Sequence, residues 1–182
     1  MQSEIDAIYS QIRALKLQVR EIRERMAPEP VEEYRFLSAD GEVSLSDLFG
    51  DHRDLWIVHN MGRSCSYCTM WADGYSGYLR HLDTRGAFVM VSPDAPDVQR
   101  AVAAERDWRF PMVQDSTGDF TRAMGFLTDA DGYYPGISAF HRNEDGTIVR
   151  SGWTYLGPGD DYNMVWPLMD LLKEGAGEWE PK

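Results

Sequence analysis

The chain has 182 residues, 43% of them hydrophobic and 12% aromatic, which suffices for one domain with a hydrophobic core and is not typical of a disordered protein. Its formal net charge is −12 at pH 7 and no stripe of lysine and arginine interrupts the acidic sequence, so we expect no binding to nucleic acid. The apolar runs are only strand-sized, which argues against a membrane-spanning helix, and acidic residues stand near the N-terminus where a signal peptide would carry basic ones, so we expect a cytoplasmic protein.

Residues 1–26 have the clearest periodicity in the chain. Seven apolar residues recur there at alternating steps of three and four: Ile5, Ile8, Ile12, Leu15, Val19, Ile22 and Met26. The spacing predicts an amphipathic helical arm with the apolar positions of a coiled coil. β-Branched residues at the a positions favour a parallel two-stranded coil, although Ile at two of the three d positions weakens that preference. We expect a homodimer through this helix; the alternative is one helix that lies along its own domain.

Residues 27–33, APEPVEE, are predicted to be a linker, because Pro28 and Pro30 cannot continue a helix. Strands and helices then alternate through the domain at 34–182. We expect strands at 34–37, 55–59, 87–91 and 111–114, helices from the cysteine pair to about 82 and at 96–106 and 120–124, a hairpin of 137–141 with 147–150, and a last helix at 167–173. This order predicts an α/β sandwich with a mixed sheet.

Cys65 and Cys68, in the stretch RSCSYCTMWADG, are the only cysteines of the chain. Two cysteines at a short fixed spacing indicate redox chemistry or metal binding rather than a framework of structural disulfides. A strand before the pair and a helix after it place Cys65 at the helix N-terminus, where free N–H groups and the helix dipole stabilise a thiolate. Cys68 lies one turn further on, within reach of a mixed disulfide formed at Cys65. We therefore predict that Cys65 is the nucleophile and Cys68 the resolving cysteine.

Several stretches resemble the thioredoxin superfamily, and within it the redoxin branch. They are FLSADGEVSLSDLFG (36–50), the strand that leads into SCSYC, FPMVQDSTGDFTRAMGF (110–126) and PGISAFHRNEDGTIV (135–149). More narrowly, CSYCTMWADG followed by YYPGISAF resembles a bacterial thioredoxin-like family of largely unknown function. The resemblance implies a thioredoxin-like three-layer sandwich around a mixed central sheet. It also implies thiol–disulfide exchange with a disulfide-containing protein or a small-molecule thiol, using a cellular reductant and no bound cofactor.

The resemblance implies roles for four further residues. Pro135 falls where the superfamily keeps a cis-proline, and the alternative is an ordinary trans proline that opens a strand. Because this loop presents backbone to the substrate disulfide in the superfamily, Tyr134 and Gly136 are candidate substrate contacts. His59 stands about where thioredoxins hold a buried acid that manages the proton of the second cysteine, and the alternative is a structural histidine.

Three residues beside the cysteines are further candidates for substrate binding. Arg63 is placed to lower the pKa of Cys65. Tyr67 lies between the two cysteines and Trp71 follows them, where aromatic side chains can line a groove, although packing is the simpler interpretation. Peroxiredoxins place a Pro and a Thr upstream of their reactive cysteine, whereas residues 61–64 here are MGRS, so we do not expect efficient peroxidase activity.

A non-catalytic protein is the competing hypothesis: a thioredoxin-fold module that binds a metal ion or a protein partner. Cys65 and Cys68 would supply two of about four ligands of a zinc site. His141, on the strand after Pro135, is the histidine that we expect to approach them. No histidine forms a paired ligand motif with another, and we assign no metal to the site.

Overall fold

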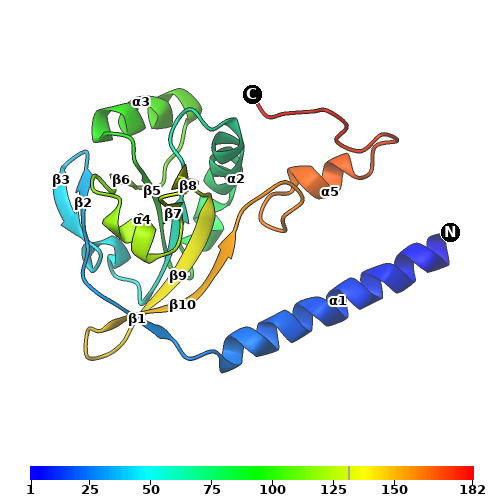
Figure 1. Ribbon diagram of the computed structural model, residues 1–182, viewed down its shortest axis with the longest axis horizontal. Coiled ribbons are helices and arrows are strands. Elements are labelled where there is room, and N and C mark those ends of the chain that lie inside the picture. The colour runs from blue at the N-terminus through cyan, green and yellow to red at the C-terminus, as the bar shows by residue number, and fades with distance from the viewer. Residues whose placement is uncertain (131) are drawn as a thin grey trace.

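An eight-stranded mixed sheet forms the centre of the computed structural model, which describes residues 1–130 and 132–182 (Figure 1). The strand order is β1-β10-β9-β4-β5-β6-β2-β3, and β7 and β8 form a separate two-stranded sheet. The strands are β1 (Glu29–Val31), β2 (Arg35–Ser38), β3 (Gly41–Ser44), β4 (Asp54–His59), β5 (Ala87–Ser92), β6 (Met112–Gln114), β7 (Leu127–Thr128), β8 (Gly132–Tyr133), β9 (Gly136–Arg142) and β10 (Ile148–Tyr155). The helices are α1 (Gln2–Arg25), a 3-10 turn η1 (Asp47–Phe49), α2 (Ser66–Leu82), α3 (Pro96–Arg106), α4 (Asp119–Ala123) and α5 (Val165–Met169).

Strand β4 lies inside the sheet, parallel to β5 and antiparallel to β9. Its sequence is nearly continuously apolar because both of its faces are covered. Leu55 and Ile57 belong to a core cluster that includes Phe49 of η1 and Phe120 of α4. Val58 points to the other face, into a cluster with side chains of α2 and α3. The two clusters make a three-layer α/β sandwich, which confirms the predicted fold class.

Most predicted elements match the structure within one or two residues, but the second hairpin strand is longer and the last helix shorter than expected. We predicted the strand at 147–150, whereas β10 continues to Tyr155. We predicted a helix at 167–173, whereas α5 covers Val165–Met169. Leu171 and Leu172 are 78% and 62% exposed, so the segment has no buried apolar face beyond the first turn. A short helix without tertiary packing is not stable enough to propagate.

Part of the predicted linker is a strand. Glu29–Val31 form β1, which pairs antiparallel with β10. Pro30 is tolerated because β1 is an edge strand and its missing N–H leaves no ladder bond unmade inside the sheet. An ion pair between Glu29 and Arg150 (2.6 Å) adds to the pairing. The β7–β8 hairpin was also not expected.

Helix α1 extends away from the sheet on the same side of the molecule as α5 (Figure 1). It spans the predicted arm, and none of its residues is buried. Lys16 forms an exposed ion pair with Asp161 (2.7 Å). The helix itself is confirmed, and the homodimer stays a prediction. Among the described residues, no helix combines the length and the apolar character that crossing a membrane requires.

Candidate functional site

The cysteine pair lies where the loop after β4 enters α2. Cys65 is the N-cap residue of α2, and its Sγ accepts a hydrogen bond from the backbone N–H of Cys68 (3.1 Å). This bond satisfies one of the N–H groups that a helix N-terminus leaves without an intrahelical partner. The side chain of Cys68 faces inward and is only 3% exposed, whereas Cys65 is partly exposed. The predicted position of Cys65 at a helix N-terminus is therefore confirmed.

The loop between β4 and α2 is held by two polar side chains that the sequence reasoning missed. Asn60 Oδ1 accepts a hydrogen bond from the N–H of Gly62 (2.7 Å), and Asp94 Oδ2 accepts one from the N–H of Arg63 (2.7 Å). Gly62 has φ +101°, and a Cβ there would lie 3.2 Å from Asp94 Oδ1. The loop therefore requires glycine at this position. The position of Asp94 could have been predicted, because it follows the end of β5, and the carboxyl ends of the adjacent parallel strands β4 and β5 meet at one edge of the sheet.

Hydrogen bonds separate the acidities of the two thiols. The thiol of Cys68 and the backbone N–H groups of Cys68 and Tyr67 donate to Cys65 and lower its pKa to about 7, against the opposing effect of partial burial. The same hydrogen bond, together with burial, raises the pKa of Cys68 well above its ordinary value. Of the two thiols, Cys65 is therefore the one that ionises near pH 7, and Cys68 keeps its proton and donates it to the Cys65 thiolate in a hydrogen bond.

The residues beside the pair differ in their accessibility. Arg63 is exposed and is joined to the site through its backbone N–H. Tyr67 is partly buried and stacks on Trp166 (centroids 6.2 Å apart). Trp71 is 2% exposed and belongs to the core cluster under α2, which agrees with the simpler interpretation of that residue. Arg63 and Tyr67 therefore remain the more accessible of the three predicted substrate contacts.

The peptide bond before Pro135 is trans, contrary to the cis bond that we expected. The backbone on both sides of it is held by strand-like hydrogen bonds. The N–H of Tyr134 donates to the carbonyl of Phe126 (2.8 Å), and the carbonyl of Pro135 accepts from the N–H of Leu156 (2.9 Å). These bonds hold the chain in the direction of β9, and a trans proline accommodates that path.

His59 lies in the core beside the start of β9. It pairs in register with Gly136, stacks on Phe126 (centroids 4.1 Å apart), and has its Nε2 3.0 Å from Ser138 Oγ. Burial, with a smaller contribution from the positive charge of Arg150, lowers the pKa of His59 to about 3. The histidine is therefore neutral near pH 7 and does not titrate in the range that the predicted proton-managing role requires. The structural interpretation of His59 fits this environment.

Tyr134 and Gly136 flank Pro135 at the start of β9. A Cβ on Gly136 would lie 1.9 Å from the ring of Phe126, so packing alone requires glycine there. Tyr134 packs partly buried against the core cluster beside Phe120. Their role as substrate contacts stays a prediction.

His141 lies at the opposite end of β4 from the cysteine loop, which corrects the expectation that it approaches the pair. It pairs in register with Asp54, and its Nδ1 lies 2.7 Å from Asp54 Oδ1. Asp54 and His59 are five residues apart on β4, or about 16 Å at 3.3 Å per residue. Across the described parts of the chain, no group of three or more His, Cys, Asp and Glu side chains is placed to hold a metal ion.

Comparisons with known proteins give a family and a fold. A family model described as a bacterial protein of unknown function (DUF899) matches residues 10–181. None of the curated proteins matches the chain. Among solved structures, Xanthomonas campestris peroxiredoxin Q is similar at 19% identity and a TM-score of 0.57, with 67% of this chain and 79% of that one covered.

Two further solved structures are similar to the same degree. Mycobacterium tuberculosis peroxidoxin BcpB is 17% identical over 70% of this chain and 84% of its own, with a TM-score of 0.57. Enterococcus faecalis AhpC is 19% identical over 73% of this chain and 82% of its own, with a TM-score of 0.59. At these identities the similarity establishes the peroxiredoxin-like thioredoxin fold.

Proposed function

Because the chain belongs to DUF899, a bacterial family of unknown function, we propose an activity from the chemistry of its site: thiol–disulfide exchange, with Cys65 as nucleophile and Cys68 as resolving cysteine. The observation that carries this proposal is the asymmetry of the pair. Cys65 is partly exposed and has a pKa of about 7, whereas Cys68 is buried and keeps its proton. A thiol with a pKa near the ambient pH combines a useful thiolate fraction with good nucleophilicity.

In the first step the Cys65 thiolate attacks one sulfur of a substrate disulfide. A bond forms between Cys65 Sγ and that sulfur, the substrate S–S bond breaks, and the other substrate sulfur leaves as a thiolate that takes a proton from solvent. The mixed disulfide removes the negative charge from Cys65, and with it the hydrogen bond that raises the pKa of Cys68. The Cys68 thiol then ionises more easily at the moment when it must react.

In the second step the Cys68 thiolate attacks Cys65 Sγ. The Cys65–Cys68 disulfide forms and the remaining substrate sulfur leaves as a thiolate, so that two electrons have passed from the protein dithiol to the substrate disulfide. A cellular dithiol reductant reverses these steps and regenerates the pair. A dithiol of this kind is maintained in the reducing cytoplasm, which is the compartment that we propose.

We place the substrate against the exposed side of Cys65. Arg63 and Tyr67 flank that cysteine, and Tyr134 and Gly136 lie at the start of β9, which pairs with the strand that leads to the cysteine loop. A disulfide-containing protein or a small-molecule disulfide would meet backbone and aromatic surface at this position.

The test uses oxidised glutathione as the substrate with the wild type, Cys65→Ser and Cys68→Ser. We expect the wild type to form an intramolecular disulfide, a loss of about two mass units by mass spectrometry, and to regain its thiols with dithiothreitol. Cys68→Ser should accumulate a glutathione adduct on Cys65, and Cys65→Ser should form neither product. Ser64→Ala is the matched control and should behave as the wild type.

Two results would overturn the proposal. One is an adduct on Cys68 in the Cys65→Ser variant at the wild-type rate. The other is a wild-type pair that stays unmodified across the range of glutathione potentials, which would favour the non-catalytic module. Hydrogen peroxide serves as the contrasting oxidant, and we expect it to oxidise Cys65 without the acceleration of a peroxidase, because MGRS replaces the Pro and Thr upstream of the cysteine.

A further inference from the structure

Helix α1 carries a continuous apolar surface that no part of the described chain covers. We call it the α1 seam and define it by the seven residues at a and d positions: Ile5, Ile8, Ile12, Leu15, Val19, Ile22 and Met26. Each of them is between 37% and 59% exposed. The seam spans about 21 residue steps, or about 32 Å at 1.5 Å per residue. Exposed apolar patches of this extent mark interaction sites.

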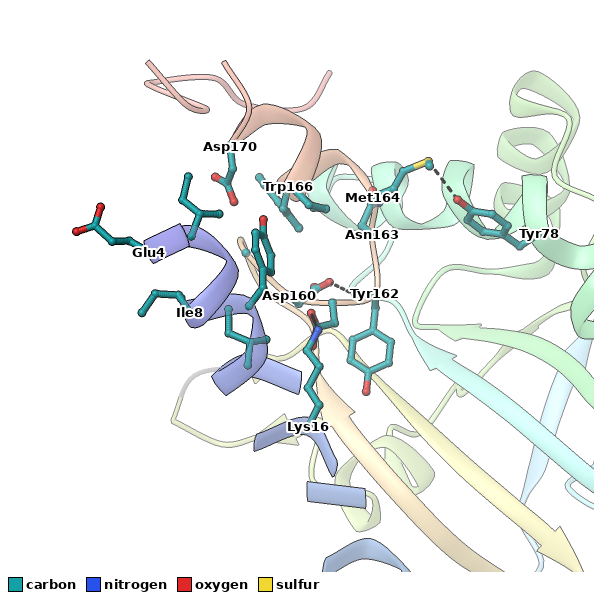
Figure 2. A pocket seen from close by; sticks show the side chains of 16 residues that line it. Glu4, Ile8, Lys16, Tyr78, Asp160, Tyr162, Asn163, Met164, Trp166 and Asp170 are labelled. Carbon is teal, nitrogen blue, oxygen red and sulfur yellow. Dashed lines mark hydrogen bonds and ion pairs between the residues drawn. The ribbon is translucent and has the colours of Figure 1, made fainter. Parts of the chain in front are cut away.

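The N-terminal half of the seam forms one wall of a groove of about 970 Å³ (Figure 2). Ile5, Ile8 and Ile12 lie on this wall, and the segment 159–170 forms the other wall with Met164 and Trp166. Figure 2 shows these two walls facing one another across the groove. Besides its apolar side chains, the groove is lined by four carboxylates, those of Glu4, Asp160, Asp161 and Asp170, and by one basic side chain, Lys16, which forms an ion pair with Asp161. The lining is therefore acidic on balance.

The charges along α1 are divided between its two halves. The N-terminal half, up to Arg13, carries Glu4 and Asp6 and one basic residue, Arg13 itself. The other half carries four basic residues against two acidic ones; the basic residues are Lys16, Arg20, Arg23 and Arg25. Lys16 is already paired with Asp161 of its own chain, so the three arginines are the ones that remain for a partner's groove. The acidic groove is therefore complementary to the C-terminal half of α1 and not to its N-terminal half.

We propose that the groove and the α1 seam are the dimer interface of this protein, in which α1 of a second copy lies antiparallel to the first. The basic half of each helix then occupies the acidic groove of the other chain. Ile5 packs against the partner's Ile22, and Ile12 against the partner's Leu15. The same register places Glu4 beside the partner's Arg25.

The antiparallel direction follows from the charges, and it replaces the parallel coil that the a positions suggested. In a parallel pair the two acidic grooves meet, and Glu4 faces the partner's Tyr9 rather than a basic residue. In the antiparallel pair each end of the interface gains an ion pair, and the two-fold axis makes both ends equivalent.

The α1 helix of a second copy also covers the whole length of the seam. A small ligand in the groove would leave Leu15, Val19 and Ile22 uncovered. The seven seam residues with Tyr9, Tyr162 and Met164 are all at least 37% exposed. If each of these ten side chains buries on the order of 80 Å² on association, together they bury about 800 Å² per partner, which is the size of a standard interface.

Sedimentation equilibrium of the full-length protein tests the interface. We expect the mass of two chains at micromolar concentration. Val19→Asp should raise the dimer dissociation constant at least about 100-fold, because a carboxylate at an a position of the seam loses its water on association. Leu17→Asp is the matched control: Leu17 is 59% exposed and lies at the f position, opposite the seam, so its dissociation constant should change less than about threefold.

Circular dichroism separates lost association from lost folding in these variants. A monomeric wild type at micromolar concentration overturns the proposal, and so does an equal effect of the two substitutions. A monomer that instead binds to lipid vesicles assigns the seam to a membrane surface and equally overturns it.

Disulfide trapping tests the direction in a Cys65→Ser/Cys68→Ser background, which keeps the result independent of the proposed function. Added cysteines cross-link only where their Cα atoms come within about 7 Å. We expect a mixture of Ile5→Cys and Ile22→Cys chains to form the mixed cross-link, and Ile5→Cys chains alone to form none. Cross-linking of Ile5→Cys with itself shows a parallel pair and overturns the direction.

A charge exchange gives an independent readout of the same contact. Glu4→Arg and Arg25→Glu should each weaken the dimer, and the double variant should restore it. Arg13→Glu, at a position outside the interface, is the control and should leave association unchanged. Equal weakening by the single and double variants contradicts the Glu4–Arg25 contact.

Discussion

Helices α1 and α2 are both amphipathic, yet they relate to the domain in opposite ways. Five residues of α2 are buried, among them Cys68, Trp71 and Tyr75, whereas none of α1 is. The connections explain the difference, because α2 is held between two central strands, β4 and β5, while α1 is connected to the sheet through the edge strand β1. Periodicity in a sequence thus predicts that a helix has an apolar face, and the connections decide what covers that face.

The difference also bears on the site. Burial of the inner face of α2 keeps Cys68 out of water and protonated, while the N-terminus of the helix presents Cys65. One helix therefore supplies both members of the pair with unequal acidities. Helix α1 contributes no side chain to the cysteine site, and its apolar surface is available for association.

The largest effect that separates the two helices is expected for a core substitution in α2. Trp71→Ala should lower the free energy of unfolding by about 3–5 kcal/mol, because it removes a fully buried aromatic ring and leaves a cavity. Leu17→Ala in α1 is the matched control and should change it by no more than about 0.5 kcal/mol. Urea unfolding measures both. Similar losses for the two variants would show that α1 is part of the folded core.

A second buried group, His59 on the face of the sheet opposite α2, should give stability a dependence on pH. Burial lowers its pKa to about 3 in the folded protein, below the unfolded value of 6.5. Well above pH 6.5 His59 is neutral in both states, and the protein has its full free energy of unfolding. That free energy falls as the pH drops below 6.5, because the unfolded chain then binds a proton that the folded chain excludes. Between about pH 6.5 and 4.5 the loss is about 2.3 kcal/mol, because the slope approaches about 1.36 kcal/mol per unit only below the unfolded pKa.

His59→Gln isolates this contribution, since glutamine does not titrate and can hydrogen-bond to Ser138. The variant should show a flatter fall in the free energy of unfolding between about pH 6.5 and 4.5. His81→Gln, at an exposed position, is the control and should follow the wild type. A His59→Gln profile that is parallel to the wild type over this range would contradict the buried neutral histidine.

The reactivity of the exposed end of α2 should follow the pKa of Cys65. Its alkylation by iodoacetamide should rise with pH to a midpoint of about 7 and then level off. At pH 7 about half of Cys65 is thiolate, against about 3% for a free cysteine with a pKa of about 8.5. Because a thiolate of lower pKa is also a weaker nucleophile, we expect alkylation about threefold faster than that of a free cysteine.

The variant Cys68→Ala tests the cause of that shift. Removing the Cys68 thiol removes the hydrogen bond that contributes most to the lowered pKa, so the alkylation midpoint should move to higher pH. Mass spectrometry should find the label on Cys65 alone in the wild type, because Cys68 is buried and protonated. An unchanged midpoint in Cys68→Ala would assign the shift to the helix N-terminus alone.

Some features of the fold and of the site could be predicted from the sequence, and others could not. The order of elements and the position of Cys65 followed from apolar runs and from the strand that precedes the pair. The face of the sheet on which His59 lies did not follow from the sequence. Alternation places His59 on the opposite face from Val58, but which of the two faces α2 covers depends on the crossover between the strands. The trans bond before Pro135 and the strand at Pro30 depend on hydrogen bonds to residues distant in the sequence.

The smallest effect is expected at the ion pair between α1 and the C-terminal segment, Lys16 with Asp161. Both side chains are more than half exposed, so solvent screens their attraction and Lys16→Ala should lower the free energy of unfolding by less than about 0.5 kcal/mol. Lys173→Ala, at an exposed position of the C-terminal segment, is the matched control in the same urea titration. A loss well above about 1 kcal/mol for Lys16→Ala alone would mean that α1 is held to its own domain, and the groove would then be closed by the chain itself rather than open to a second copy.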